Sequence, residues 1–150
     1  MTEQPFIFVG TTDLTVLDAD FVIRIPKEIL SKEILFSVFA LEGRFPSESG
    51  TSWDALLDCL RDLSWIRAKR IAIVHESLPL KDSGRDCDIY LRILKTAVRD
   101  WMERRDTKVI PGVRLNYVEH ELMVYFPSTV KDAIDQRSKE NGTIKVAKLE

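Results

Sequence analysis

Short apolar runs alternate with longer amphipathic stretches along this chain. Three runs rich in β-branched residues predict strands at residues 21–25, 70–75 and 121–126, and a fourth candidate strand lies at 6–9. The run at 70–75 is apolar at almost every position, which is typical of a parallel strand that is covered on both faces.

Three amphipathic stretches lie between these runs. Apolar residues recur at helical spacing over residues 27–41, 53–63 and 86–105, so each stretch is predicted to be a helix. The order of strands and helices predicts an α/β fold: a small parallel sheet of three strands, or four if residues 6–9 join it, with crossover helices. We expect one domain over residues 1–126, followed by a C-terminal tail at 127–150 that is partly helical.

Composition limits the class of protein. Hydrophobic residues make up 45% of the chain and charged residues 31%, which is typical of a soluble globular protein. No apolar run is long enough to span a bilayer, and the first residues do not resemble a secretory signal, so we expect a cytoplasmic protein with no membrane partner.

The net charge of −2 is unevenly distributed. Residues 1–66 contain eleven acidic and five basic residues, whereas residues 67–110 contain seven acidic and eleven basic residues. A nucleic-acid-binding domain is usually basic overall, so direct binding of nucleic acid is not expected. The acidic first half favours a basic protein partner, because complementary charge accelerates and orients docking.

The sequence contains little that suggests catalysis, a cofactor or a metal site. Cys59 and Cys87 lack the spacing of metal ligands, and no phosphate-binding glycine motif is present, so we expect neither metal nor cofactor. His75 lies at the end of a predicted strand, where Ser77 or Cys87 could supply a nucleophile for a small hydrolase. A solvent-exposed histidine without a catalytic role is the more common interpretation, and no catalytic residue is predicted.

The predicted helix at 53–63 carries two distinct faces. Trp53, Leu56, Leu57, Leu60 and Leu63 form an apolar face, and Thr51 or Ser52 can cap the first turn. Three acidic residues at intervals of four, Asp54, Asp58 and Asp62, form a second face on which like charges repel one another. They could still have ordinary structural roles. Asp54 would then interact favourably with the helix dipole in the first turn, Asp58 would pair with Arg61, and Asp62 would be solvated.

The segment around this helix contains, in order, Phe45-Pro46, Gly50, Asp54-Ala55-Leu56 and Asp58-Cys59-Leu60. These residues match the binding loop and second helix of the barstar family of ribonuclease inhibitors in order and without a gap, so the segment resembles that family. The resemblance extends over about residues 21–126 and implies a barstar-like fold. It also implies an immunity protein or antitoxin that inserts an acidic helix into a nuclease active site. Asp54 and Asp58 would then take the places of RNA phosphates, with Asp58 the dominant one, and the partner would be a basic ribonuclease or toxin domain.

The sequence departs from the family pattern at several positions. Glu48 and Ser49 replace aromatic residues of the loop, Ser52 replaces an asparagine, and Leu57 replaces a tryptophan. We therefore expect a target other than barnase. A binding module without inhibitory activity is the first alternative and a small hydrolase the second, and by resemblance the free protein is expected to be a monomer. The predicted partner-binding residues are Asp54, Asp58, Glu48, Ser52, Gly50, Asp62, Leu57 and Asp100.

Overall fold

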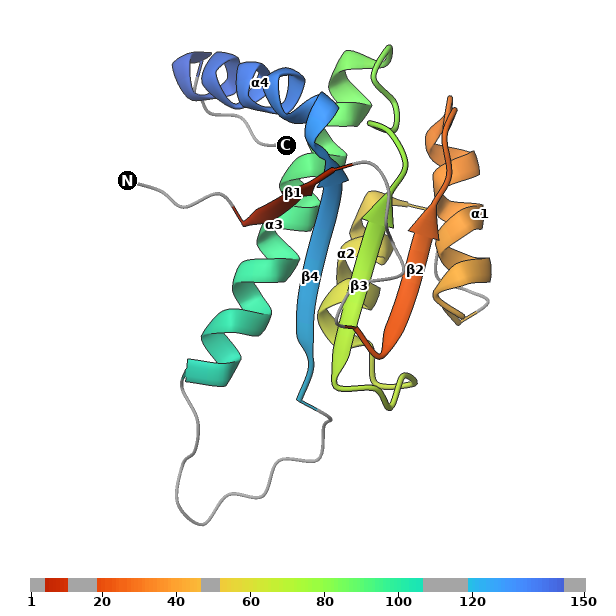
Figure 1. Ribbon diagram of the computed structural model, residues 1–150. Helices are drawn as coiled ribbons and strands as arrows, with labels where there is room; N and C mark the ends of the chain where they lie inside the picture. The colour runs from red at the N-terminus through yellow and green to blue at the C-terminus, as the bar shows by residue number, and fades with distance from the viewer. Residues whose placement is uncertain (1–4, 11–18, 47–51, 107–118, 145–150) are drawn as a thin grey trace.

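The computed structural model describes residues 5–10, 19–46, 52–106 and 119–144 (Figure 1). These residues form a parallel four-stranded sheet in the order β1-β4-β3-β2. The fold class predicted from the sequence is confirmed, and residues 6–9 do join the sheet. The strands are β1 (Phe6–Val9), β2 (Phe21–Ile25), β3 (Arg70–His75) and β4 (Glu121–Pro127).

Strand β3 explains why its sequence lacks a clear polar face. Ile71 and Ile73 point into the main core, whereas Ala72 and Val74 belong to a second buried cluster. Successive side chains of a strand point to opposite faces, so both faces of β3 exclude water, as its apolar composition predicted.

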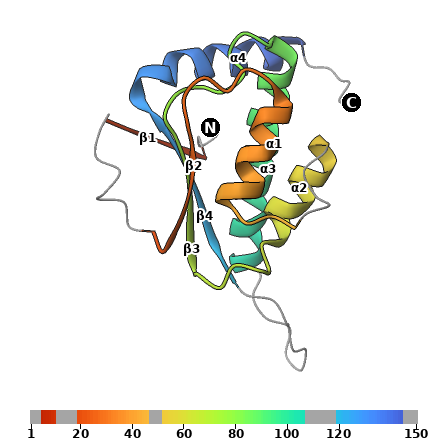
Figure 2. The ribbon, with the colours of Figure 1, turned by 90° about the vertical axis from the view of Figure 1, so that its right-hand side faces the viewer.

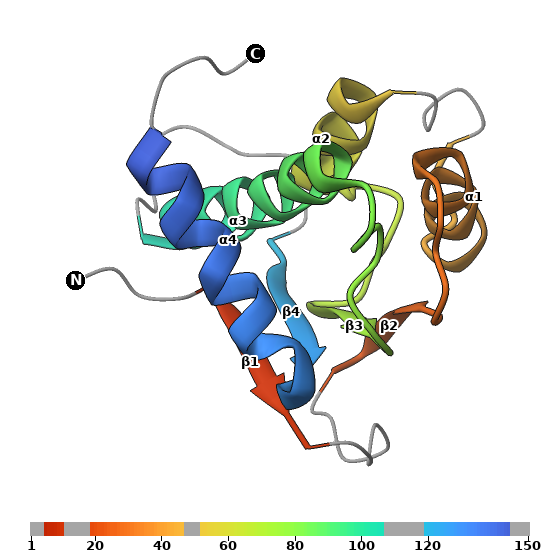
Figure 3. The ribbon, with the colours of Figure 1, turned by 90° about the horizontal axis from the view of Figure 1, so that it is seen from above.

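Three helices cover one face of the sheet: α1 (Lys32–Glu42), α2 (Trp53–Asp62) and α3 (Gly84–Asp106). Figure 2 shows all three on the same side of the sheet, and the main core lies between these two layers. Seen from above, α2 lies between α1 and α3 and farther from the strands than either of them (Figure 3). The central position of α2 leaves its outer side facing away from the rest of the protein.

Helix α1 begins later than its apolar spacing predicted. Glu28 has a φ of 62°, in the left-handed region, which interrupts a right-handed helix. The helix starts after Ser31, whose hydroxyl accepts a hydrogen bond from the backbone N–H of Ile34. The carbonyl of Ile29 instead accepts a hydrogen bond from the N–H of Leu80, so the residues before α1 form a loop tied to the segment after β3.

A 3-10 turn (Ser128–Val130) and helix α4 (Lys131–Ile144) follow β4, within the segment predicted as a partly helical tail. Ile134 of α4 is fully buried in the main core. Arg137 forms an ion pair of 2.9 Å with Asp88, and the Lys95 ammonium donates to the Ser138 hydroxyl at 3.1 Å. Helix α4 therefore packs against the fold through both apolar and polar contacts with α3 and the core.

Candidate functional site

Helix α2 has defined ends and a firmly buried inner side. The Ser52 hydroxyl caps the first turn by accepting from the N–H of Ala55, as one of the two predicted caps. The helix ends at Leu63, which has a φ of 48° and donates its N–H to the carbonyl of Cys59. Leu56 and Leu60 are fully buried, so α2 is held in place by its own apolar face.

The outer side of α2 presents the three aspartates predicted from their spacing. Asp54, Asp58 and Asp62 are all exposed, and Asp62 accepts a hydrogen bond of 3.3 Å from the Ser64 hydroxyl. Within the described part of the chain, neither the Asp54 nor the Asp58 carboxylate forms a hydrogen bond or an ion pair. These two carboxylates are therefore available to cationic groups of another molecule.

Arg61 pairs with Asp100 on α3, whereas the sequence had suggested Asp58 as its structural partner. Its Nε lies 3.3 Å from Oδ2 of Asp100 on α3, and Nη2 of Arg104 lies 2.6 Å from the same oxygen. The Arg104 guanidinium also lies 4.1 Å from the centre of the Trp101 ring. The charge of Asp100, which was predicted as a partner contact, is thus balanced within the protein. Arg61 forms its ion pair with Asp100 and not with Asp58.

The other predicted binding residues fall into two groups. Leu57 is half-buried against the main core, and the Ser52 hydroxyl is used by the helix cap. Glu48 and Gly50 lie outside the described residues.

Two aromatic side chains outside α2, those of Trp101 and His120, also position this helix. Trp101 is buried and its indole Nε1 donates to the carbonyl of Leu60 at 2.8 Å. Leu60 lies in the last turn of α2, where carbonyls lack partners within the helix, so the indole satisfies one of them. His120 is buried too, and its two ring nitrogens lie 2.8 Å from the carbonyl oxygens of Leu63 and Ala68. Neither of these contacts had a signal in the sequence.

Replacing Trp101 by phenylalanine is expected to destabilise the protein by about 1–3 kcal/mol, because the buried Leu60 carbonyl loses its donor while most of the ring packing remains. The matched control is Met102→Ala on the exposed neighbour, which should change the free energy of unfolding by less than about 0.5 kcal/mol. Urea unfolding of both variants measures the difference. Equal stability of Trp101→Phe and the wild type would show that this hydrogen bond does not secure the end of α2.

His75 is not the exposed histidine that its place at a strand end suggested. It is 3% exposed, and its ring stacks on Phe126 with the ring centres 4.0 Å apart. Nδ1 donates to the Tyr125 carbonyl at 2.9 Å, and the Tyr90 hydroxyl donates to Nε2 at 2.7 Å. Burial lowers the pKa of His75 to about 3, although its bond to the Tyr125 carbonyl opposes the shift. Both ring nitrogens are thus occupied, which leaves neither available to activate a nucleophile.

The thiol of Cys87, one of the two candidate nucleophiles, is not activated either. Burial raises the pKa of the Cys87 thiol to about 11, which disfavours the reactive thiolate. A metal site is not found among the described residues either, because no three side chains from histidine, cysteine, aspartate or glutamate come together in a group that could hold an ion. In the same part of the chain, no helix has both the length and the apolar composition needed to cross a membrane.

The family model of barstar, the barnase inhibitor, matches residues 21–112, which is more than half of the chain. This chain belongs to the barstar family. The match includes α2 and its three aspartates, and it leaves β1, β4 and α4 outside. Neither the comparison with curated proteins nor that with solved structures found a match.

Proposed function

We propose that this barstar-family protein inhibits a ribonuclease by inserting the outer side of α2 into the nuclease active site. The observation that supports this most is the state of Asp54 and Asp58, which are exposed and form no ion pair with the described residues. A ribonuclease binds RNA phosphates with arginine, lysine and histidine side chains. Carboxylates can take the places of those phosphates through charge-assisted hydrogen bonds.

The rigidity of α2 supports the same proposal. Its first turn is capped by Ser52, its inner residues are buried, and its last turn is held by Trp101. Side chains that are already ordered lose little entropy on docking, so more of the interaction energy appears as affinity. We further propose that the partner is a basic nuclease or toxin domain and that the inhibitor acts in the cytoplasm. Cys59 and Cys87 form no disulfide, which suits a reducing compartment.

The position of Arg61 supports a target that differs from barnase. This exposed cation stands three residues after Asp58, where a uniformly basic cleft would meet a like charge. Asp100 balances part of that charge, but Arg104 shares the same carboxylate. The proposed target therefore has a cleft whose basic groups face Asp54 and Asp58 without extending over Arg61.

Affinity capture tests this proposal. Wild-type protein and the double variant Asp54→Asn/Asp58→Asn are immobilised, and bound proteins from lysate and secreted fractions of the source organism are identified by mass and assayed for ribonuclease activity. A second double variant, Glu33→Gln/Asp132→Asn, removes two exposed carboxylates outside α2 and is the matched control.

We expect a ribonuclease that binds the wild type and the control, loses its activity on binding, and does not bind the α2 variant. A partner that binds in the same pattern but has no nuclease activity would instead favour a non-inhibitory binding module. Capture of the same proteins by the wild type and by both variants would rule out a role for the aspartates.

A further inference from the structure

Arg61 lies on the outer side of α2, in line with the two aspartates that have no partner there. Asp54 and Arg61 are seven residues apart, which is close to two full turns, so they lie almost on one line along the helix. Asp58 stands between them, and the buried residues Leu56 and Leu60 are on the opposite side of the helix. The line from Asp54 to Arg61 is only about 10 Å long. A specific interface buries about 800 Å² of each partner, so a protein that covers both aspartates covers Arg61 as well.

The guanidinium of Arg61 is held at its Nε, and its two terminal nitrogens are available. Nε donates to Oδ2 of Asp100 on α3 at 3.3 Å. Nη2 of Arg104 holds the same carboxylate oxygen at 2.6 Å, so the group that anchors Arg61 is itself fixed. Nη1 and Nη2 of Arg61 form no hydrogen bond with the described residues, and the side chain is 44% exposed. The remaining N–H donors of this arginine can therefore bind another molecule.

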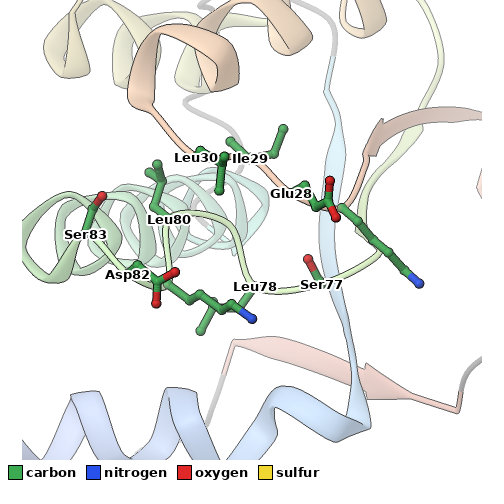
Figure 4. A pocket seen from close by; sticks show the side chains of 10 residues that line it. Glu28, Ile29, Leu30, Ser77, Leu78, Leu80, Asp82 and Ser83 are labelled. Carbon is green, nitrogen blue, oxygen red and sulfur yellow. The ribbon is translucent and has the colours of Figure 1, made fainter.

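The outer side of α2 is a helix surface without a pocket for a small ligand. Figure 4 shows a cavity of about 260 Å³ between the loop before α1 and the segment after β3, and no residue of α2 lines it. A smaller cavity of about 170 Å³ between α3 and the sheet has no lining from α2 either. Small molecules bind in concave sites, whereas proteins dock on exposed helix surfaces of this kind. The occupant expected at Arg61 is therefore a protein.

The chemistry of the guanidinium decides which group of that protein lies opposite Arg61. Docking removes water from the terminal N–H groups, and a buried donor without an acceptor costs free energy. A lysine or arginine of the partner at this place would bring like charges together. A carboxylate accepts two parallel hydrogen bonds from the terminal nitrogens and neutralises the charge. Because Asp100 already holds Nε, the arginine loses little freedom when it binds.

We infer that Arg61 is a partner-binding residue and that it holds a carboxylate of the nuclease, next to the basic groups that hold Asp54 and Asp58. This inference rests on the proposed inhibition of a ribonuclease and adds an acidic group to the partner's basic cleft. Along α2 the docking surface carries two negative charges followed by a positive one. Such a pattern disfavours nucleases whose clefts are basic throughout, so Arg61 contributes to the choice of target.

The affinity of the captured nuclease for Arg61→Gln tests the inference, because the direction of the change separates the two kinds of cleft. Removing a positive charge strengthens binding to a partner that is basic throughout. We expect the opposite result, a loss of about tenfold, since the carboxylate of the partner is left in the interface without its cation. Arg61→Glu should lose about 100-fold. Arg61→Lys keeps the charge but not the paired N–H groups, so its loss should be smaller than that of Arg61→Gln.

Arg24→Gln is the matched control. Arg24 is an exposed residue of β2, and its neighbours Ile23 and Ile25 point into the main core. Its own side chain therefore points to the face of the sheet away from the helices. This variant removes the same charge without touching α2 and should bind as the wild type does. Isothermal titration calorimetry measures the affinities, and urea unfolding shows that each variant is folded.

The outcomes separate this inference from the proposed inhibition. Unchanged or tighter binding of Arg61→Gln, together with lost binding of Asp54→Asn/Asp58→Asn, would overturn the carboxylate and leave the inhibition standing. A loss with Arg61→Gln but none with the aspartate variant would overturn phosphate mimicry and retain the Arg61 contact. An equal loss with Arg24→Gln would overturn the contact, because charge at a distance would then explain the change. Capture of no nuclease by the wild type would overturn both proposals.

An exchange of charges identifies the carboxylate. Arg61→Glu is titrated against nuclease variants in which single acidic residues of the cleft are changed to lysine. One of these pairs should regain at least about tenfold of the affinity that Arg61→Glu loses with the unchanged nuclease, because the ion pair is restored in reverse. Recovery by none of the pairs would show that a neutral acceptor lies opposite Arg61, and it would overturn the charge assigned to that group.

Discussion

Changing Asp58 to asparagine is expected to weaken binding of the nuclease partner by about 100- to 1000-fold, which corresponds to about 3–4 kcal/mol. Asparagine keeps the shape of the side chain but removes the charge that opposes the partner's cations, which stay buried in the complex. Asp58 lies near the middle of α2, so a docked partner excludes water from it more completely than from the two flanking aspartates.

The same substitution should leave the folded protein intact. Asp58 is exposed and has no partner among the described residues, and removing its charge relieves repulsion from Asp54 and Asp62. The free energy of unfolding should change by less than about 0.5 kcal/mol.

Isothermal titration calorimetry with the captured nuclease measures the affinity, and urea unfolding measures the stability. Asp62→Asn is the matched control within the same face. Its carboxylate is hydrogen-bonded to Ser64 at the end of the helix, so we expect a loss of less than about tenfold. Comparable losses for Asp58 and Asp62 would indicate general electrostatic attraction rather than phosphate mimicry at defined positions.

The strands could be predicted because each is a short, largely apolar run, and in β3 every position but the first is buried. The start of α1 could not, because the apolar spacing continues from Leu30 into the helix although the backbone turns at Glu28. The left-handed conformation of Glu28 goes with the hydrogen bond between the Leu80 N–H and the Ile29 carbonyl. That contact joins segments about fifty residues apart, and local sequence patterns contain no information about it.

The acidic face could also be predicted from the local sequence, because residues spaced by four lie on one side of a helix. The partner of Arg61 could not be predicted in this way. Asp58 is three residues away in sequence, but Asp100, thirty-nine residues away, is the acid that the packing of α2 on α3 brings into contact. The burial of His75 was missed because its polar side chain gives no sign of the acceptor and donor provided by Tyr125 and Tyr90.

The buried position of His75 links the stability of the protein to pH. Its pKa is about 3 in the folded protein, compared with 6.5 for an exposed histidine, so between these values the unfolded chain binds a proton that the folded protein does not. The unfolded state is therefore favoured as the pH falls below 6.5. Above 6.5 the ring is neutral in both states, and its contribution to stability is fully present.

The free energy of unfolding is accordingly expected to fall by about 1.4 kcal/mol for each pH unit below 6.5, reaching a total loss of about 4–5 kcal/mol near pH 3 from this residue alone. Urea unfolding at intervals from pH 7.5 to pH 4 measures the slope. His75→Asn can still donate to the Tyr125 carbonyl but cannot take up a proton, so it keeps the contributions of all other groups and loses that of His75. Below pH 6.5 the slope of the variant should be smaller by about 1.4 kcal/mol per pH unit, which corresponds to one bound proton. Parallel slopes for the two proteins would mean that His75 is accessible to protons in the folded state, and that the network joining it to Tyr90 and Tyr125 opens more easily than its burial implies.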